Sequence, residues 1–83
     1  MYILSQNKLL TVNSTILSSI NIEKIEWDDP DMIKKYPDAH KIVAYGKGEK
    51  VYLLGIYDGK KSAEWKLSWL HEAMKENQKT FEF

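Results

Sequence analysis

The fold is decided by residues 41–74, which read KIVAYGKGEKVYLLGIYDGKKSAEWKLSWLHEAM. Two runs rich in β-branched and aromatic residues, Ile42–Tyr45 and Val51–Tyr57, flank a short connection that contains Gly46 and Gly48. Such residues favour strands, and glycines permit the positive φ angles of a tight hairpin turn. We therefore predict an antiparallel hairpin. The second run is apolar at both parities, so we expect it to be covered on both faces.

The segment after this hairpin is predicted to form one amphipathic helix, from about Lys60 to Asn77. Four apolar residues recur in it at spacings of four, three and four, and at about 100° per residue they share one narrow face. We expect this face to pack on the sheet, with Gly55 of the preceding strand allowing the helix to approach closely. The four residues are Ala63, Leu67, Leu70 and Met74.

Two tryptophans of this helix, Trp65 and Trp69, lie outside the core stripe and form a second stripe of their own. Indoles are enriched at interfaces because they bury much area with few rotatable bonds, so we predict a docking surface here. The alternative is that the Trp27–His40 segment or the tail covers them within one chain. The tail, Lys79–Phe83, alternates like a strand and can extend its own sheet or that of another molecule; a frayed terminus is the other reading.

The first part of the chain also predicts strands. Tyr2–Leu4 and Leu9–Val12 flank the polar Ser5–Lys8, which is typical of a hairpin. Apolar residues change parity between Ser19 and Trp27, and we favour a bulge near Glu23–Lys24 as the cause.

The Asp28–His40 segment is predicted to be a loop with a short helical turn, in which Asp29 is the N-cap and Pro30 the first helical residue. Its carboxylates and His40 make a metal site conceivable, but their spacing does not match the calcium-binding loop. We expect solvated turn residues here and no cofactor.

Together these patterns predict one α+β domain over residues 1–83. It consists of an antiparallel meander sheet of about five strands with one C-terminal helix packed on one face. The predicted core is Ile3, Leu10, Val12, Ile22, Ile25, Ile42, Ala44, Val51, Leu53, Ala63, Leu67, Leu70 and Met74.

The amino-acid composition weighs against several classes of function. The twelve basic residues are all lysines, they balance twelve acidic residues, and cysteine is absent. Without cysteine there are no disulfides or thiolate metal ligands. The opening apolar run ends at Ser5, unlike a signal peptide, and no stretch approaches the roughly 20 apolar residues of a membrane span. We expect a soluble, cytoplasmic protein with no membrane contact.

Enzyme chemistry has little support in the sequence. No serine has the Gly-x-Ser-x-Gly surroundings of an esterase nucleophile, and the Gly46–Gly48 turn is too short for a phosphate-binding loop. We predict that the protein is not an enzyme. Nucleic-acid binding is the runner-up, because lysines alternate with Tyr45, Tyr52 and Tyr57 as on a stacking platform. Zero net charge and the missing arginines weigh against it.

The opening Met1–Gln6, together with Tyr52–Tyr57 leading into a helix that contains Ala63, resembles small uncharacterised proteins of Gram-positive bacteria and their prophages. In those proteins a strand written roughly Leu-Gly-x-Tyr runs into a C-terminal helix. The resemblance covers the two ends of the chain and omits Asp28–His40. It implies a compact sheet with one helix and no known activity, so it assigns no functional residue.

The sequence therefore predicts a non-catalytic protein-interaction or regulatory module of unknown pathway that forms a homodimer. The alternative function is a single-stranded nucleic-acid-binding protein that uses a lysine and tyrosine face of the sheet. A heterologous protein partner is a further possibility for the same surface. The predicted partner-binding residues are Trp65, Trp69, Phe81 and Phe83.

Overall fold

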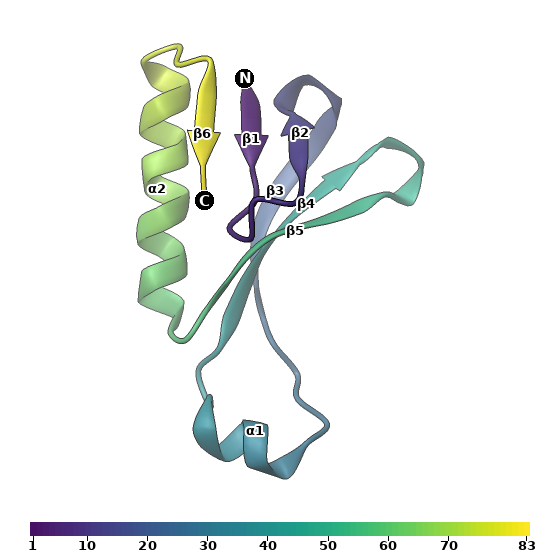
Figure 1. The fold of residues 1–83 in the computed structure, drawn as a ribbon, viewed down its shortest axis with the longest axis vertical. Helices are drawn as coiled ribbons and strands as arrows, with labels where there is room; N and C mark the ends of the chain where they lie inside the picture. The colour runs from purple at the N-terminus through teal and green to yellow at the C-terminus, as the bar shows by residue number, and fades with distance from the viewer.

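The computed structural model describes residues 1–83 as two three-stranded sheets, one long helix and one short helix (Figure 1). The α+β class is confirmed. One sheet has the order β2-β1-β6 and the other the order β3-β4-β5. The elements are β1 (Tyr2–Leu4), β2 (Thr11–Asn13), β3 (Leu17–Lys24), α1 (Pro30–Lys35), β4 (His40–Gly46), β5 (Val51–Tyr57), α2 (Lys60–Lys75) and β6 (Thr80–Glu82), with 3-10 turns η1 (Ser14–Ile16) and η2 (Lys47–Glu49).

The single five-stranded meander is wrong, because the chain forms two sheets instead. Between β2 and β3 the turn η1 redirects the chain, and the side chain of Asn13 caps it by accepting a hydrogen bond from the backbone N–H of Thr15 at 3.1 Å. β3 therefore begins a new sheet and does not pair with β2. The free edge of β1 is taken by β6, which pairs with it in parallel, whereas β1 and β2 are antiparallel.

A β-bulge in β5 sets which side chains face the core. Ile42 of β4 lies opposite Gly55, but its neighbour Val43 lies opposite Leu53, so Leu54 is an extra residue in β5. A bulge places two successive side chains on the same face and reverses the alternation beyond it. Leu54 is buried and Leu53 is exposed as a result.

The core lies between the two sheets and α2, and it contains most of the residues predicted for it. Ile3, Val12, Ile42, Ala44, Ala63 and Leu70 are buried; Leu10, Ile22 and Leu67 are partly buried against them. Ile25 is half-buried.

Three of the predicted core residues are exposed. Val51 and Leu53 lie on the outer face of β5, because the bulge puts Leu54 inward in their place. Met74 is 38% exposed near the end of α2, where it lines a hollow together with Leu17 and Ile20 of β3.

Two further local predictions are corrected. The irregularity in β3 lies between Leu17 and Ser19, not at Glu23–Lys24, and the parity change near Trp27 arises because β3 ends at Lys24. At Gly55 it is not the helix that approaches. A side chain there would meet the ring of Tyr57, whose hydroxyl oxygen lies 2.8 Å from the ideal Cβ position.

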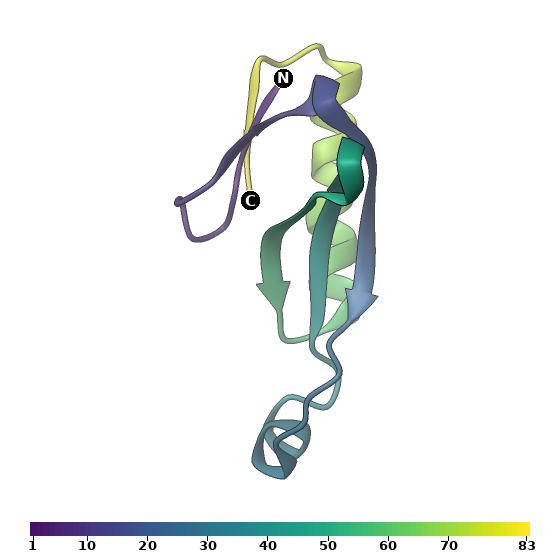
Figure 2. The same ribbon diagram turned by 90° about the vertical axis from the view of Figure 1, so that its right-hand side faces the viewer.

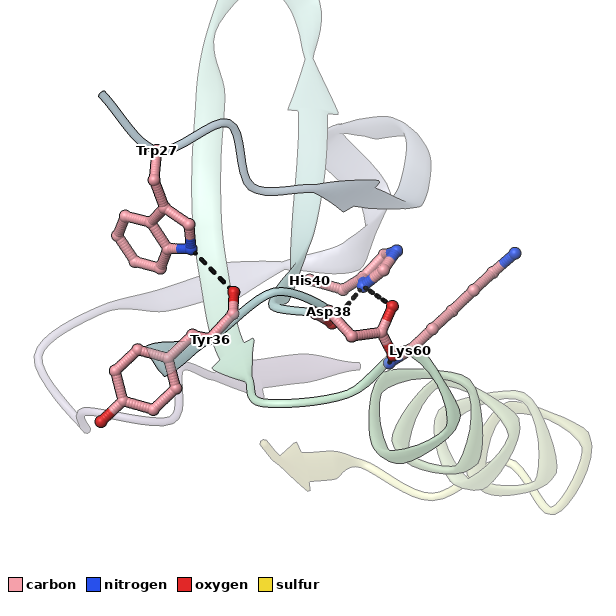
Figure 3. A network of polar contacts seen from close by, with 5 residues as sticks. All are labelled: Trp27, Tyr36, Asp38, His40 and Lys60. Carbon is pink, nitrogen blue, oxygen red and sulfur yellow. Dashed lines mark hydrogen bonds and ion pairs between the residues drawn. The ribbon is translucent and has the colours of Figure 1, made fainter. Parts of the chain in front are cut away.

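The segment between β3 and β4 projects from the end of the sheet and carries α1 at its tip (Figures 1 and 2). As predicted, Asp29 caps this helix by accepting from the backbone N–H of Asp31 at 2.9 Å, and Pro30 is its first residue. We call this projecting segment, residues 25–39, the lobe. It is closed by the indole of Trp27, which donates a hydrogen bond to the carbonyl oxygen of Tyr36 at 3.1 Å (Figure 3).

The two sheets are joined by Gln6, in the turn between β1 and β2. Its backbone N–H donates to the carbonyl oxygen of Leu54 at 2.7 Å, and its side-chain oxygen accepts from the N–H of Ile56 at 2.9 Å. One turn residue thus forms hydrogen bonds with the backbone of the bulge residue, Leu54, and with that of Ile56 beyond it. Neither helix has the length and apolar character needed to cross a lipid bilayer.

Candidate protein-interaction site

The outward face of α2 presents both predicted tryptophans to solvent. Trp65 is 65% exposed and Trp69 is 57% exposed, whereas Ala63, Leu70 and Ala73 of the same helix are buried. At about 100° per residue, Ala63 and Leu70 lie roughly 140–160° from Trp65, on the opposite side of the helix, and Ala73 lies at the boundary, about 40° from Trp69. The helix therefore has two apolar sides, and the fold covers one of them.

Neither segment that could have covered the indoles does so. The lobe that carries α1 extends beyond the end of α2 at which Lys60 lies, so it does not lie across the helix (Figures 1 and 3). The tail runs back along one flank of α2 as β6 (Figure 1).

The structure places the two phenylalanines of the tail inside the chain's own sheet. Phe83 is 7% exposed and belongs to the core, and its N–H donates to the carbonyl oxygen of Leu4 at 2.9 Å. Phe81 is half-buried, and its ring meets that of Phe83 edge to face with centroids 5.0 Å apart. Phe83 is therefore not accessible to a partner, whereas Phe81 keeps part of its surface exposed.

Lys66 joins the helix to the tail. Its ammonium nitrogen lies 5.2 Å from the ring centroid of Trp69 and 5.6 Å from that of Phe81. A cation over an exposed aromatic ring is worth about 0.5–1 kcal/mol. Lys66 was not among the predicted site residues, although a lysine three positions before a tryptophan on a helix is within reach of its ring.

Charged residues flank the tryptophans along the axis of α2. Lys61 precedes them by one turn, and Glu72 and Glu76 follow them; all three are exposed. Lys75 lies 3.4 Å from one carboxylate oxygen of Glu72 within the same helix. The face is thus basic at its beginning, aromatic in the middle and acidic at its end.

His40 and Asp38, both considered for a metal site, form other contacts. His40 is 7% exposed, and its Nδ1 lies 2.7 Å from the carbonyl oxygen of Asp38 (Figure 3). Because a carbonyl oxygen can only accept, Nδ1 carries the proton. One carboxylate oxygen of Asp38 accepts from the backbone N–H of Lys60 at 3.1 Å, which caps α2. No three acidic or histidine side chains lie close enough together to hold a metal ion.

The three tyrosines of the runner-up hypothesis are divided between the two faces of the sheet. Tyr52 lies opposite Ala44 on the core side, and Tyr57 covers Gly55 on that same side. Tyr45 lies on the outer face, where its hydroxyl donates to the carboxylate of Glu23. This hydrogen bond, burial and the negative charge of Glu23 all raise the pKa of Tyr45.

A second exposed apolar surface lies on the outer face of β5. Val51, Leu53 and Ile56 are each about half exposed, and Leu9 of the neighbouring turn is 86% exposed. Together with residues of that turn they line a hollow of about 430 Å³. The sequence did not reveal this surface, because a bulge in β5 cannot be recognised from a run that is apolar at both parities.

Comparison with known proteins gives no match to any family model, curated protein or solved structure. The resemblance to small proteins of Gram-positive bacteria and their prophages stays a prediction.

Proposed function

We propose that this protein is a non-catalytic protein-interaction module that self-associates through the outward face of α2, and that it acts in the cytoplasm. The observation that carries the proposal is the exposure of Trp65 and Trp69, at 65% and 57%, on a helix whose other side is already buried. Two adjacent indoles left in water are a large apolar surface, and contact with a protein removes that surface from water.

The size of the surface indicates how tight the association can be. A fully buried indole accounts for about 150–250 Å², so the exposed parts of Trp65 and Trp69 offer roughly 250 Å² per protomer. A standard interface buries about 800 Å² on each partner. Even with flanking residues the contact is smaller than that, so we expect weak association, with a dissociation constant in the micromolar range or above.

The composition of the face favours a protein partner. Indoles are enriched at the centres of protein interfaces, where surrounding residues exclude water from them. Here the ammonium of Lys66 lies over the ring of Trp69, so the ring is partly ordered before any partner arrives. Ordering in advance lowers the entropic cost of binding.

Sedimentation velocity over a range from about 10 to about 500 µM brackets the expected affinity and tests the proposal. We expect the wild-type sedimentation coefficient to rise with concentration, and the Trp65→Ala/Trp69→Ala variant to remain monomeric while keeping its circular dichroism spectrum. The matched control is Val51→Ala/Ile56→Ala, which removes exposed apolar side chains from the other surface. A wild type that stays monomeric throughout, or a control that loses association instead, would contradict the proposal.

Single-stranded nucleic-acid binding remains the competing proposal, and the same samples test it. Fluorescence anisotropy with labelled oligonucleotides at low salt is the appropriate measurement, because binding through lysines weakens steeply as salt rises. We expect no binding, since only Tyr45 of the three tyrosines lies on the outer face of the sheet.

A further inference from the structure

The outward face of α2 is electrostatically self-complementary, which bears on how a second copy would dock. At about 100° per residue, five side chains fall within about 40° of the direction in which Trp65 points. All five are exposed. In chain order they are Lys61, Trp65, Trp69, Glu72 and Glu76.

From this order we propose that two copies of the chain pack their α2 helices antiparallel about a twofold axis, with Lys61 of each against Glu72 and Glu76 of its partner; this rests on the self-association proposed above. Parallel packing would place Lys61 against Lys61 and the two glutamates against their own copies. Like charges placed together oppose association, and opposite charges favour it and fix its orientation.

The other charged groups of the helix do not cancel this pattern. Glu64, Lys66 and Lys75 lie at about 80–100° from Trp65 and Lys60 at about 140°, so all four start outside the docking face. Of these, Lys66 reaches back over the ring of Trp69, near the middle of the face and not at its acidic end. The ammonium of Lys75 lies 3.4 Å from the carboxylate of Glu72 and partly neutralises its negative charge. Glu76 has no such ion pair. The acidic end of the face therefore persists.

The position of the axis follows from the proposed pairing. If Lys61 meets Glu72 and Glu76 of the partner, the axis passes close to residues 67–68, and Ser68 is the exposed residue there. Its side chain is small, and its hydroxyl already donates to the carbonyl oxygen of Trp65 at 2.7 Å. Two helices can approach at such a residue, while Trp65 and Trp69 on either side pack against those of the partner.

Site-directed cross-linking tests this geometry cleanly, because the chain contains no cysteine. A Ser68→Cys variant places two thiols beside the axis, so a short bis-maleimide is expected to link it into a covalent dimer. A Lys61→Cys variant places its thiols at opposite ends of the pair and is expected to stay monomeric. A mixture of Lys61→Cys and Glu76→Cys proteins is expected to cross-link as a heterodimer.

Charge-reversal variants provide a second, independent test of the antiparallel arrangement. Lys61→Glu is expected to weaken association about 3- to 10-fold, the effect of losing two symmetric exposed ion pairs. Adding Glu72→Lys and Glu76→Lys in the same chain should restore it. All of these positions are exposed, so the variants are expected to fold, which circular dichroism checks.

The outcomes separate this inference from the proposed function. Cross-linking of Lys61→Cys to itself would indicate parallel helices and overturn the antiparallel arrangement while leaving self-association intact. Association without any of these cross-links would place the contact on another surface and overturn the arrangement as well. A wild type that never associates would remove the proposed function itself.

Discussion

At the scale of single residues, Gly55 and Tyr57 fit together on the core side of β5. The ring of Tyr57 occupies the space that a side chain at position 55 would fill. The hydroxyl of Tyr57 is buried and has no hydrogen-bond partner. Such a hydroxyl loses its contacts with water without gaining others, which costs stability.

Replacing Tyr57 by phenylalanine should therefore stabilise the protein. Removing an unpaired, partly desolvated hydroxyl is worth about 1 kcal/mol in the free energy of unfolding. Urea denaturation at neutral pH measures the change, and Tyr2→Phe, at an exposed position, is the control. A Tyr57→Phe variant less stable than wild type would mean that the hydroxyl has a partner.

The same substitution should alter the pH dependence of stability. Burial raises the pKa of Tyr57 above its usual value of 10. The folded state then holds the phenolic proton more tightly than the unfolded state, so stability is retained below the unfolded pKa and falls as the pH rises through it. Tyr57→Phe should lose less stability than wild type between about pH 9 and pH 11. Tyr45, whose pKa is also raised, accounts for part of the loss that remains.

At the scale of elements, a contact from a distant part of the chain defines the start of α2 and a local turn defines its end. The residue before the helix, Gly59, offers no side-chain cap, and Asp38 of the lobe supplies the acceptor for Lys60 instead. At the other end Asn77 adopts a positive φ of 56° and turns the chain into β6. A residue in this conformation is a common way to end a helix.

Removing the cap provided by Asp38 should cost stability. We expect Asp38→Ala to lower the free energy of unfolding by about 1 kcal/mol, the usual value of a capping side chain. Asp38→Asn keeps an oxygen acceptor and should lose less. Urea midpoints of the two variants compare them, and equal losses would show that the cap contributes through the charge of Asp38 alone.

The tail is expected to be part of the folding unit. Phe83→Ala removes a buried ring, which costs about 3–5 kcal/mol. That is a large share of the roughly 5–15 kcal/mol that stabilises a small domain. Thermal unfolding should show a much lower midpoint than for Leu9→Ala, which alters an exposed residue. A midpoint close to that of wild type would mean that β6 is dispensable.

These elements show what the sequence could and could not predict. The sequence predicts the helix α2, the hairpin β4–β5 and the start of α1, because periodicity, glycines and an Asp-Pro cap are local signals. It does not predict the parallel pairing of β6 with β1, since this pairing joins the two ends of the chain. The inward position of Leu54 depends on a bulge whose backbone is hydrogen-bonded by Gln6, which is distant in the sequence.

The candidate site likewise has a part that the sequence predicts and a part that depends on the fold. The exposure of Trp65 and Trp69 agrees with their angular position on the helix, which helical spacing alone can give. The burial of Phe83 and the position of Lys66 against Phe81 both depend on where the tail lies. Local sequence patterns do not determine that position.

At the scale of the whole molecule, the chain covers one side of its long helix and leaves the other in water. The core and the β3-β4-β5 sheet lie against the inner side, while the lobe with α1 projects beyond the end of that sheet (Figure 2). A small domain with one indole-bearing face and a linear order of charges along it has the properties of an isologous contact surface. The second apolar surface, on β5, is the competing location.

The most direct test is to dilute ¹⁵N-labelled protein and follow its indole N–H resonances by NMR. The chain has three tryptophans, and Trp27 is the internal reference because its indole is already hydrogen-bonded to Tyr36. We predict that the indole resonances of Trp65 and Trp69 move with concentration while that of Trp27 stays fixed. Indole resonances that are all independent of concentration, or backbone shifts confined to Val51, Leu53 and Ile56, would contradict the account.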